Sequence, residues 1–240
     1  MTKPLIVVTG ASSGIGASIA KSFAKSGHAL LLLARDLKAM EDLKLDNAIC
    51  KSVDVTNAQA LQDAIKQAEE VHGKTECIVN CAGLMLLGDI ENQDKTEWQK
   101  MFDVNVIGLL NGMQAVLSDM KARNSGTIIN ISSIAGKKTF PAHAAYCGTK
   151  FAVHAISENV REEVADTNVR VITIAPGAVE TPLLSHTTSQ EIKDNYDVWK
   201  ESMGGVLNPQ DIADCVLFAF NQPQNVCVRE IAVTATRQQP

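Results

Sequence analysis

Two residues of the segment AAYCGTKFAV, at positions 144–153, combine types and spacing that suit acid–base chemistry. Tyr146 and Lys150 are four positions apart, and side chains at this spacing lie on the same face of a helix. Two interpretations of the pair are open. In the first, the lysine extends past a half-buried tyrosine and keeps its ammonium group in water. In the second, the phenol has a pKa lowered toward neutral pH and acts as a general acid or base.

Alternating patterns along the whole chain predict the elements that would position such a pair. Short runs rich in branched apolar residues are typical of strands that are buried on both faces. Amphipathic stretches separate them, as where Ile15, Ile19 and Phe23 repeat at helical spacing before Gly27. The pattern predicts an α/β fold, a doubly wound parallel sheet with helices on both faces. The expected strands occupy residues 5–10, 28–34, 48–55, 76–80, 126–132, 169–176 and 225–233.

The composition and length limit the classes of protein that the chain can represent. Its 240 residues predict one domain, residues 1–240, with one sizeable core. The net charge of -5 and the lack of a basic stripe argue against a nucleic-acid partner and favour small molecules. Apolar runs such as residues 29–34 are too short to span a membrane. Six cysteines without a C-x-x-C pair, and no signal-peptide pattern, predict reduced thiols in the cytoplasm.

One long stretch, residues 181–209, interrupts the alternation of strands and helices shortly before the last expected strand. Long insertions in compact domains are often lids or binding loops. We therefore expect residues 182–208 to form a lid over a substrate.

A glycine-rich loop, TGASSGIG at residues 9–16, joins the first expected strand to the first helix. Gly10, Gly14 and Gly16 permit a tight turn and a close approach of the backbone, so that amide groups at the start of the helix face a pyrophosphate. A glycine-rich stretch by itself can be only a turn. Its place between a strand and a helix of the first βαβ unit favours a dinucleotide-binding loop.

Six motifs together carry a resemblance that extends over essentially the whole chain. In order, they are TGASSGIG, NCAG at 80–83, DVNVIG at 103–108, NISSIAG at 130–136, Tyr146-x-x-x-Lys150 and APGAVET at 175–181. Their order and register resemble those of the short-chain dehydrogenase/reductase family. The resemblance implies an NAD(P)-dependent oxidoreductase with a single Rossmann-like domain, in which helices flank a parallel sheet of seven strands.

The same resemblance implies catalytic roles for four residues. Tyr146 is similar to the family's general acid/base, and Lys150, together with the nicotinamide charge, lowers its pKa and also binds the nicotinamide ribose. Ser133 hydrogen-bonds the substrate oxygen, and the family register favours it over the neighbouring Ser132. Asn105 resembles the asparagine that holds a water in a proton relay toward the lysine.

Cys81 departs from the family pattern, which usually has a second asparagine where NCAG has this cysteine. A buried, unreactive thiol is the preferred interpretation of Cys81 and of Cys77, which lies four positions earlier on the same strand face. The departure concerns the hydrogen bonds that support the central strand and leaves the catalytic residues unchanged.

The end of the second expected strand distinguishes NAD from NADP. An acidic residue there would bind the ribose hydroxyls and repel a 2'-phosphate, but the chain has Ala34 followed by Arg35. Arginine binds phosphate through two hydrogen bonds, which favours NADP; the alternative is a solvated Arg35 that pairs with Asp36. Many NADP-preferring relatives have a basic residue where this loop has Ser13. The residues expected to bind the cofactor are Gly10, Ser12, Ser13, Gly14, Ile15, Gly16, Arg35, Asp54, Val55, Asn80, Ala82, Gly83, Tyr146, Lys150, Pro176, Gly177, Val179 and Thr181.

The substrate is less closely specified. Ser133, Phe140 and His143 are expected to contact it, with Tyr196 and Trp199 contributing from the expected lid. A lone histidine such as His143 is more often a packing residue than a base, and the five histidines show no metal-binding pattern. The short C-terminal strand and the tail TATRQQP resemble the NADP-dependent branch that acts on small 3-hydroxy acids or on related alcohols and ketones.

The leading hypothesis is thus a cytoplasmic NADP-dependent alcohol dehydrogenase or carbonyl reductase. A 3-oxoacyl-carrier-protein reductase is an alternative, although the basic docking patch expected of it is not evident. A non-catalytic, cofactor-sensing protein is another, although it would have no need to keep all four catalytic residues. The long helices near residues 97–121 and 145–167 resemble those at the family's subunit interfaces, which implies a homotetramer or a homodimer.

Overall fold

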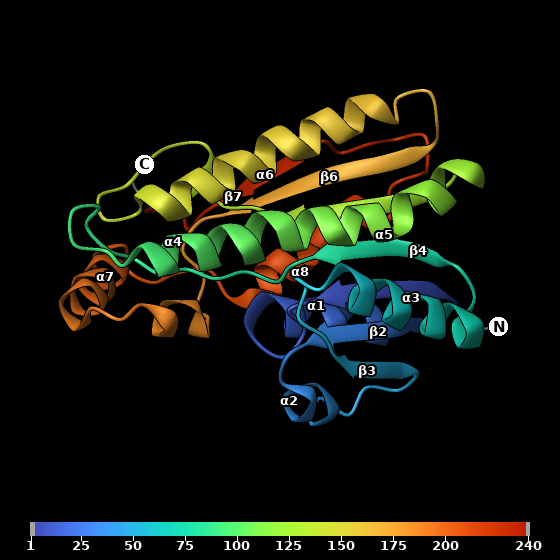
Figure 1. Ribbon diagram of the computed structural model, residues 1–240, viewed down its shortest axis with the longest axis horizontal. Helices are drawn as coiled ribbons and strands as arrows, with labels where there is room; N and C mark the ends of the chain where they lie inside the picture. The colour runs from blue at the N-terminus through green and yellow to red at the C-terminus, as the bar shows by residue number, and fades with distance from the viewer. Residues whose placement is uncertain (1–2, 239–240) are drawn as a thin grey trace.

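The computed structural model describes residues 3–238, and its centre is one sheet of seven parallel strands (Figure 1). The strands follow the order β3-β2-β1-β4-β5-β6-β7. Because the direction of winding reverses between β1 and β4, the fold is the doubly wound, Rossmann-like α/β arrangement that the sequence predicted. The strands are β1 (Lys3–Thr9), β2 (His28–Ala34), β3 (Ala48–Ser52), β4 (Thr75–Asn80), β5 (Gly126–Ile131), β6 (Val169–Pro176) and β7 (Glu230–Val233).

The last strand is much shorter than the expected residues 225–233. β7 lies at the sheet edge and pairs only with β6. Before it, the carbonyl groups of Gln222 and Val226 accept hydrogen bonds from the buried Arg170 guanidinium at 2.9 and 3.5 Å. The chain therefore reaches the edge of the sheet as a loop held by Arg170, and only its last four residues pair as a strand.

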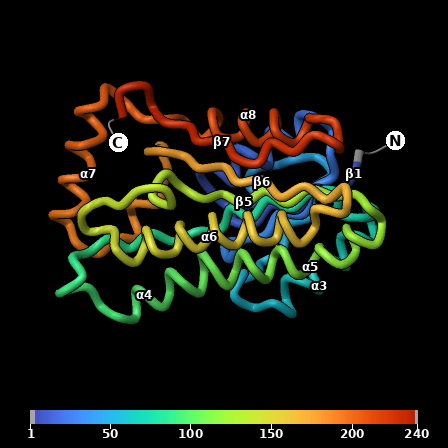
Figure 2. Tube along the Cα trace, turned by 90° about the horizontal axis from the view of Figure 1, so that it is seen from above, coloured from blue at the N-terminus to red at the C-terminus, as the bar shows by residue number. Residues whose placement is uncertain are grey.

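Helices cover both faces of the sheet. α1 and α8 pack together on one face, while α3, α5 and α6 cover the other (Figure 2). The helices are α1 (Gly14–Lys25), α2 (Leu37–Glu41), α3 (Ala58–His72), α4 (Lys95–Phe102), α5 (Gly108–Ala122), α6 (Ala144–Glu163), α7 (Gln190–Ser202) and α8 (Pro209–Phe220). Within residues 3–238, no helix combines the length and apolar character that crossing a lipid bilayer requires.

The core has two apolar layers because successive side chains of a strand point to opposite faces. On β1, Leu5 and Val7 belong to the layer under α3, α5 and α6, whereas Ile6 and Val8 belong to the layer under α1 and α8. All four side chains are fully buried. Burial on both faces accounts for the continuous apolar runs in the sequence.

A π-helical turn, Asp103–Ile107, joins α4 to α5. The helix expected near residues 97–121 is therefore one continuous helical segment with a widened turn inside it. Widened turns of this kind occur frequently at functional sites. This one carries Asn105, which the sequence predicts to be catalytic.

The segment expected to form a lid, residues 182–208, is largely helical. A 3-10 turn at Pro182–His186 precedes α7, which starts where the Ser189 hydroxyl accepts a hydrogen bond from the Ile192 amide. The sequence signal for this helix is the spacing of Ile192, Tyr196 and Trp199, which places the three on one face. α7 extends beyond the end of the sheet (Figure 1), where its inner face can cover a ligand.

Asn80 was expected to contact the cofactor ribose, but its side chain lies inside the fold. The Asn80 amide donates to Asn130 Oδ1 on the neighbouring strand β5 at 2.9 Å, and the residue is 4% exposed. Gly112 of α5 packs directly against it, since a Cβ atom there would lie 2.1 Å from Asn80 Oδ1. Asn80 therefore points toward the α5 layer and helps to join two strands and a helix.

This close packing predicts opposite effects for two helical glycines. Gly112→Ala should lower the free energy of unfolding by about 1–3 kcal/mol, because the new methyl group overlaps Asn80. Gly148→Ala in α6 is the matched control, because a Cβ atom there would make only an ordinary 3.5 Å contact with Phe102. The control should be neutral or more stable by up to about 1 kcal/mol. Urea titrations of both variants test this, and a Gly112→Ala protein as stable as the control would contradict it.

Candidate functional site

A cleft of about 1190 Å³ opens where the strands of the sheet end. The loops that follow β1, β2, β4, β5 and β6 all contribute to its lining. Ligands of open α/β sheets bind at this edge, next to the point where the strand order reverses. The volume exceeds the roughly 300–1,000 Å³ of pockets for single small molecules, so a dinucleotide and a second compound can share it. Every site residue predicted from the sequence lines this cleft except Asn80 and Asn105.

The glycine-rich loop is tightly packed against the backbone of the neighbouring loop. Gly10 has a φ of +67°, and a Cβ atom there would lie 2.8 Å from the backbone of Ala82. A Cβ atom on Gly16 would lie 2.2 Å from the Gly10 carbonyl oxygen. Ser13 precedes α1 without capping it through its side chain, so the first amide groups of the helix face the cleft without that partner. Free amides at a helix start bind anions such as a pyrophosphate.

Thr9, which the sequence interpretation did not single out, holds the two loops together. Its Oγ1 accepts hydrogen bonds from the amides of Cys81 and Ala82 at 3.0 and 3.1 Å. In place of the side chain of an asparagine at position 81, the hydrogen bonds that support this loop are those from the two backbone amides to the Thr9 hydroxyl. Burial raises the pKa of the Cys81 thiol to about 12, so this side chain is neutral packing. The signal in the sequence is a hydroxyl residue at the very end of β1, directly before Gly10.

Arg35 lies at the end of the cleft formed by β2 and is exposed. None of the ion pairs among residues 3–238 joins Arg35 to Asp36. The Asp36 carboxylate instead caps α2, where it accepts a hydrogen bond from the Ala39 amide at 3.0 Å. The structure therefore does not show the alternative in which Arg35 pairs with Asp36. The guanidinium is available to a phosphate, with Asp54 close enough to interact electrostatically.

Asn105 does not line the cleft, although it was predicted to be catalytic. Its Oδ1 accepts from the Leu84 amide at 2.7 Å, and its Nδ2 donates to the Leu84 carbonyl at 2.8 Å and to Thr149 Oγ1 at 3.0 Å. The side chain is 2% exposed. Asn105 therefore ties the loop after β4 to α6, one residue before Lys150.

The two serines after β5 have different surroundings. Ser133 is half-buried, and its Oγ accepts from the Ala135 amide at 3.0 Å and donates to the Pro176 carbonyl at 3.4 Å. Ser132 is 4% exposed, and its Oγ donates to the Lys150 carbonyl at 3.3 Å and lies 2.9 Å from His154 Nδ1. Ser132 is thus bound to α6, which leaves Ser133 as the more accessible hydroxyl.

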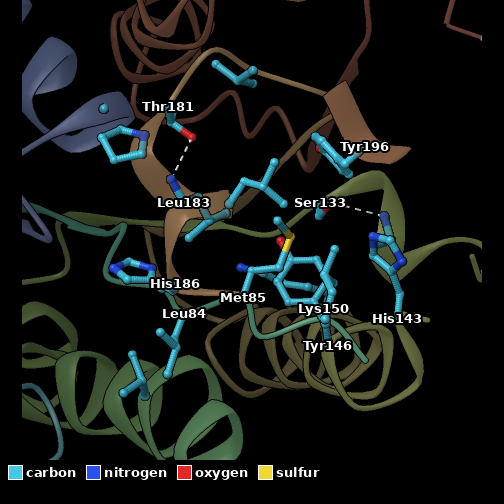
Figure 3. Close-up of a pocket in the computed structure, with 18 of the residues that line it drawn as sticks. Leu84, Met85, Ser133, His143, Tyr146, Lys150, Thr181, Leu183, His186 and Tyr196 are labelled. Carbon is cyan, nitrogen blue, oxygen red and sulfur yellow. Dashed lines mark hydrogen bonds between the residues drawn. The ribbon is translucent and has the colours of Figure 1, made fainter. Parts of the chain in front are cut away.

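Tyr146 and Lys150 project from the first turns of α6 into the cleft (Figure 3). Both are 6% exposed, and the Lys150 Nζ donates to the Ile131 carbonyl at 3.0 Å. The same Nζ lies 5.8 Å from the centre of the Tyr146 ring. Lys150 therefore does not keep its ammonium group in water. The pair shares one face of the helix, as its spacing predicts.

The protein surroundings shift both pKa values toward the neutral forms. Burial raises the pKa of Tyr146, and a hydrogen bond with the Ser133 side chain opposes this only in part. Burial lowers the pKa of Lys150 to about 8. The expected lowering of the tyrosine pKa by Lys150 is thus not produced by the residues of the chain. Tyr146 stays protonated at neutral pH and can donate its proton to an oxygen atom.

Apolar side chains surround Tyr146 on the side of the cleft away from Arg35. We call this region the apolar chamber, and it consists of Leu84, Met85, Leu87, Phe140, Leu183, Leu184, Ile192 and Tyr196. Of these, only Phe140 and Tyr196 were expected at the substrate. For Leu84, Met85 and Leu87, in the loop after β4, the signal in the sequence is the apolar run LMLL at 84–87. His143 also lines the cleft, with its ring centre 6.3 Å from that of Tyr146.

The C-terminal tail reaches the cleft as well. Gln238 lines it, and its Oε1 accepts from the Ala178 amide at 3.0 Å. A Cβ atom on Gly177 would lie 2.2 Å from this oxygen, so the glycine is needed for the tail to pack here.

Among residues 3–238, no three acidic, histidine or cysteine side chains are grouped so that they could hold a metal ion.

Comparisons with known proteins agree with this geometry. The family model for short chain dehydrogenase matches residues 4–192. An uncharacterized oxidoreductase of Staphylococcus saprophyticus is 36% identical over 240 residues, covering 98% of this chain and 96% of that protein.

Two solved structures resemble the whole chain. The closed form of serine dehydrogenase complexed with NADP+ superimposes with a TM-score of 0.92 at 28% identity, covering 98% of this chain and 96% of that one. An alcohol dehydrogenase from the archaeon Thermococcus sibiricus complexed with 5-hydroxy-NADP gives a TM-score of 0.84 at 26% identity, covering 99% and 98%. The chain therefore belongs to the short-chain dehydrogenase family of oxidoreductases.

Proposed function

We propose that this oxidoreductase transfers a hydride between the nicotinamide of NADP and a carbonyl or alcohol substrate, with Tyr146 as the general acid/base. The observation that carries the proposal is that Tyr146, Ser133 and Lys150 line the same cleft as the glycine-rich loop. A phenol, a hydroxyl and an ammonium group are what is needed to bind an oxygen atom and move a proton to or from it.

The residues of the cleft fit NADP from one end to the other. Amides of the glycine-rich loop and of the start of α1 would bind the pyrophosphate, and Arg35 would bind the 2'-phosphate. Lys150, buried beside Tyr146, would contact the nicotinamide ribose. When bound, the reduced cofactor supplies a hydride. Support comes from two similar structures that hold NADP+ and 5-hydroxy-NADP.

Tyr146 is in the correct protonation state for reduction at neutral pH. Because burial raises its pKa, the phenol carries a proton and can donate it to the carbonyl oxygen as a hydride reaches the carbonyl carbon. The C=O double bond then becomes a C–O single bond, with a new C–H bond made by the hydride and a new O–H bond made by the proton that leaves Tyr146 as phenolate. Ser133, whose hydroxyl donates to the Pro176 carbonyl at 3.4 Å in this structure, would instead donate a hydrogen bond to the same oxygen while negative charge develops on it. Asn105 positions α6 and the loop after β4 through its three hydrogen bonds.

We further propose that the protein is a homotetramer whose interfaces involve α4, α5 and α6. Large apolar side chains remain exposed on this helical layer, by 40% at Phe102, 46% at Ile107, 37% at Leu110 and 43% at Phe151. Apolar side chains gathered on neighbouring helices are typical of surfaces that a second copy of a chain covers.

The role of Tyr146 predicts a selective loss of chemistry. Tyr146→Phe should lower turnover by about 10²–10⁴-fold, the usual contribution of a positioned acid, with little change in NADPH affinity. Oxidation of NADPH with a panel of ketones and aldehydes measures turnover, and fluorescence titration measures binding. Ser133→Ala should also slow turnover, and by more than Ser132→Ala does, because the Ser132 hydroxyl bonds to α6 and is not available to the substrate oxygen. Wild-type turnover in Tyr146→Phe would rule out the assignment.

The role of Arg35 predicts a change in cofactor preference. Arg35→Ser should raise the dissociation constant of NADPH by about 10–100-fold, since hydrogen bonds to a charged group contribute about 1.5–3 kcal/mol. The affinity for NADH should be nearly unchanged because NADH has no 2'-phosphate. Lys38→Ser is the matched control, because this nearby cation is exposed on α2 and does not line the cleft. Equal weakening of both cofactors by Arg35→Ser would contradict the assignment.

The oligomer predicts how two phenylalanine variants sediment. The wild type should sediment as a species about four times the 25.8 kDa mass of the chain. Phe151→Glu places a charge in the proposed interface and should produce smaller species. Phe218→Glu is the control, because Phe218 is 58% exposed on α8, away from that layer. Sedimentation of the wild type only as a 25.8 kDa species would refute the homotetramer and the homodimer.

A further inference from the structure

The charge pattern around the apolar chamber bears on the class of substrate. The chamber packs directly against Tyr146, and Met85, Phe140 and Tyr196 come from three different segments of the chain. Figure 3 shows Tyr146 together with Met85 and Tyr196. A substrate oxygen that reaches Tyr146 therefore places the rest of its molecule among apolar side chains. Apolar groups gain from burial there, whereas an ionised group needs a partner of opposite charge.

Among residues 3–238, no unpaired lysine or arginine lines the cleft on the chamber side. Among the described residues that line it, the lysines and arginines are Arg35, Lys150 and Lys200. Arg35 lies at the opposite end of the cleft, and Lys150 donates to the Ile131 carbonyl beside the proposed reaction centre. Lys200 is paired with Glu180 at 3.4 Å and with Asp197 at 3.0 Å.

The groups next to the chamber do not supply the missing charge. The Nδ1 atom of His143 lies 2.6 Å from the Pro141 carbonyl and so carries a proton, and burial lowers the pKa of this histidine. Its imidazole is therefore neutral at neutral pH. The Lys138 ammonium stacks 4.7 Å from the centre of the Phe140 ring, and Lys138 does not line the cleft. His186 lines the cleft from the exposed turn before α7, outside the cluster of residues that forms the chamber.

Carboxylates are the prevailing charge in the segments that form the chamber. Asp89, Asp94, Glu97 and Glu191 all line the cleft. Asp89 and Asp94 follow Leu87 in the loop after β4, Glu191 lies on α7 beside Ile192, and Glu97 lies on the neighbouring helix α4. Glu97 accepts a hydrogen bond from Thr188 at 3.2 Å, which connects α4 to the segment before α7. A negatively charged substrate would thus meet negative charge near the chamber and find no cation inside it.

We propose that the substrate of this site is an uncharged, predominantly apolar ketone or aldehyde, and that carboxylate-bearing 3-oxo acids and 3-hydroxy acids are poor substrates. The inference rests on the proposed carbonyl reduction and narrows it. One structural neighbour is named serine dehydrogenase, and the substrate proposed here differs in charge from the one in that name. Serine carries a carboxylate, for which the chamber has no partner.

Matched pairs of compounds test the charge alone. Ethyl 3-oxobutanoate and 3-oxobutanoate share one ketone, and methyl 4-formylbenzoate and 4-formylbenzoate share one aldehyde. With NADPH in excess, kcat/KM should be at least about tenfold, and up to about 100-fold, higher for the ester of each pair. An acid that is reduced as well as its ester would overturn the inference while leaving the proposed reaction intact. A failure to reduce any of the four compounds, with NADPH still bound, would instead overturn the proposed reaction and the inference with it.

A variant can reverse the preference if the missing cation is its cause. Leu184→Arg places a guanidinium in the chamber and should reduce the ester-to-acid ratio of kcat/KM at least about tenfold. Leu184→Gln is the matched control, since it adds polarity without charge and should keep the ester preference. Equal ratios in the Arg and Gln variants would show that the preference does not come from charge and would overturn the inference.

Discussion

The contact between the loops after β1 and β4 is the constraint on which the rest of the site depends. These strands are neighbours at the point where the sheet reverses its order, so both loops emerge at the same place. The Thr9 hydroxyl binds the amides of Cys81 and Ala82, and Gly10 leaves no room for a side chain against Ala82. One side of the cleft therefore consists of closely packed backbone, whose amides can approach a phosphate.

The other side of the cleft depends on α6, and buried polar groups fix the position of this helix. Asn105 joins Thr149 to the Leu84 backbone, Ser132 binds the Lys150 carbonyl, and Lys150 itself binds the Ile131 carbonyl. These bonds connect the helix to two different loops at the ends of the strands. Because each group is buried, breaking a bond would leave an unpaired polar atom, which is costly in the interior of a protein. This network therefore fixes the part of α6 that carries Tyr146.

The sequence predicted most of the fold because its signals there are local. Apolar runs marked the strands, and the loop TGASSGIG and the Tyr146–Lys150 spacing marked the site. Asn80 and Asn105 were placed in the cleft, but the structure turns both inward, because their side chains bind neighbouring elements that no motif specifies. Apart from Phe140 and Tyr196, the residues of the apolar chamber were missed for the same reason. Leu184 and Met85 are far apart in the chain, and only tertiary packing brings them to Tyr146.

The same burial that positions Tyr146 and Lys150 also sets their chemistry. Removing both groups from water favours the neutral phenol and the neutral amine, so the pKa of the tyrosine rises while that of the lysine falls to about 8. A neutral phenol is a proton donor, and reduction of a carbonyl group consumes a proton at the oxygen atom. In the reaction that we propose, the apolar chamber would act twice: it would favour a substrate without charge, and it would keep the acid protonated until the substrate oxygen needs the proton. Under that proposal, chemistry and substrate selection have one physical origin, the burial of Tyr146 among apolar side chains at this end of the cleft.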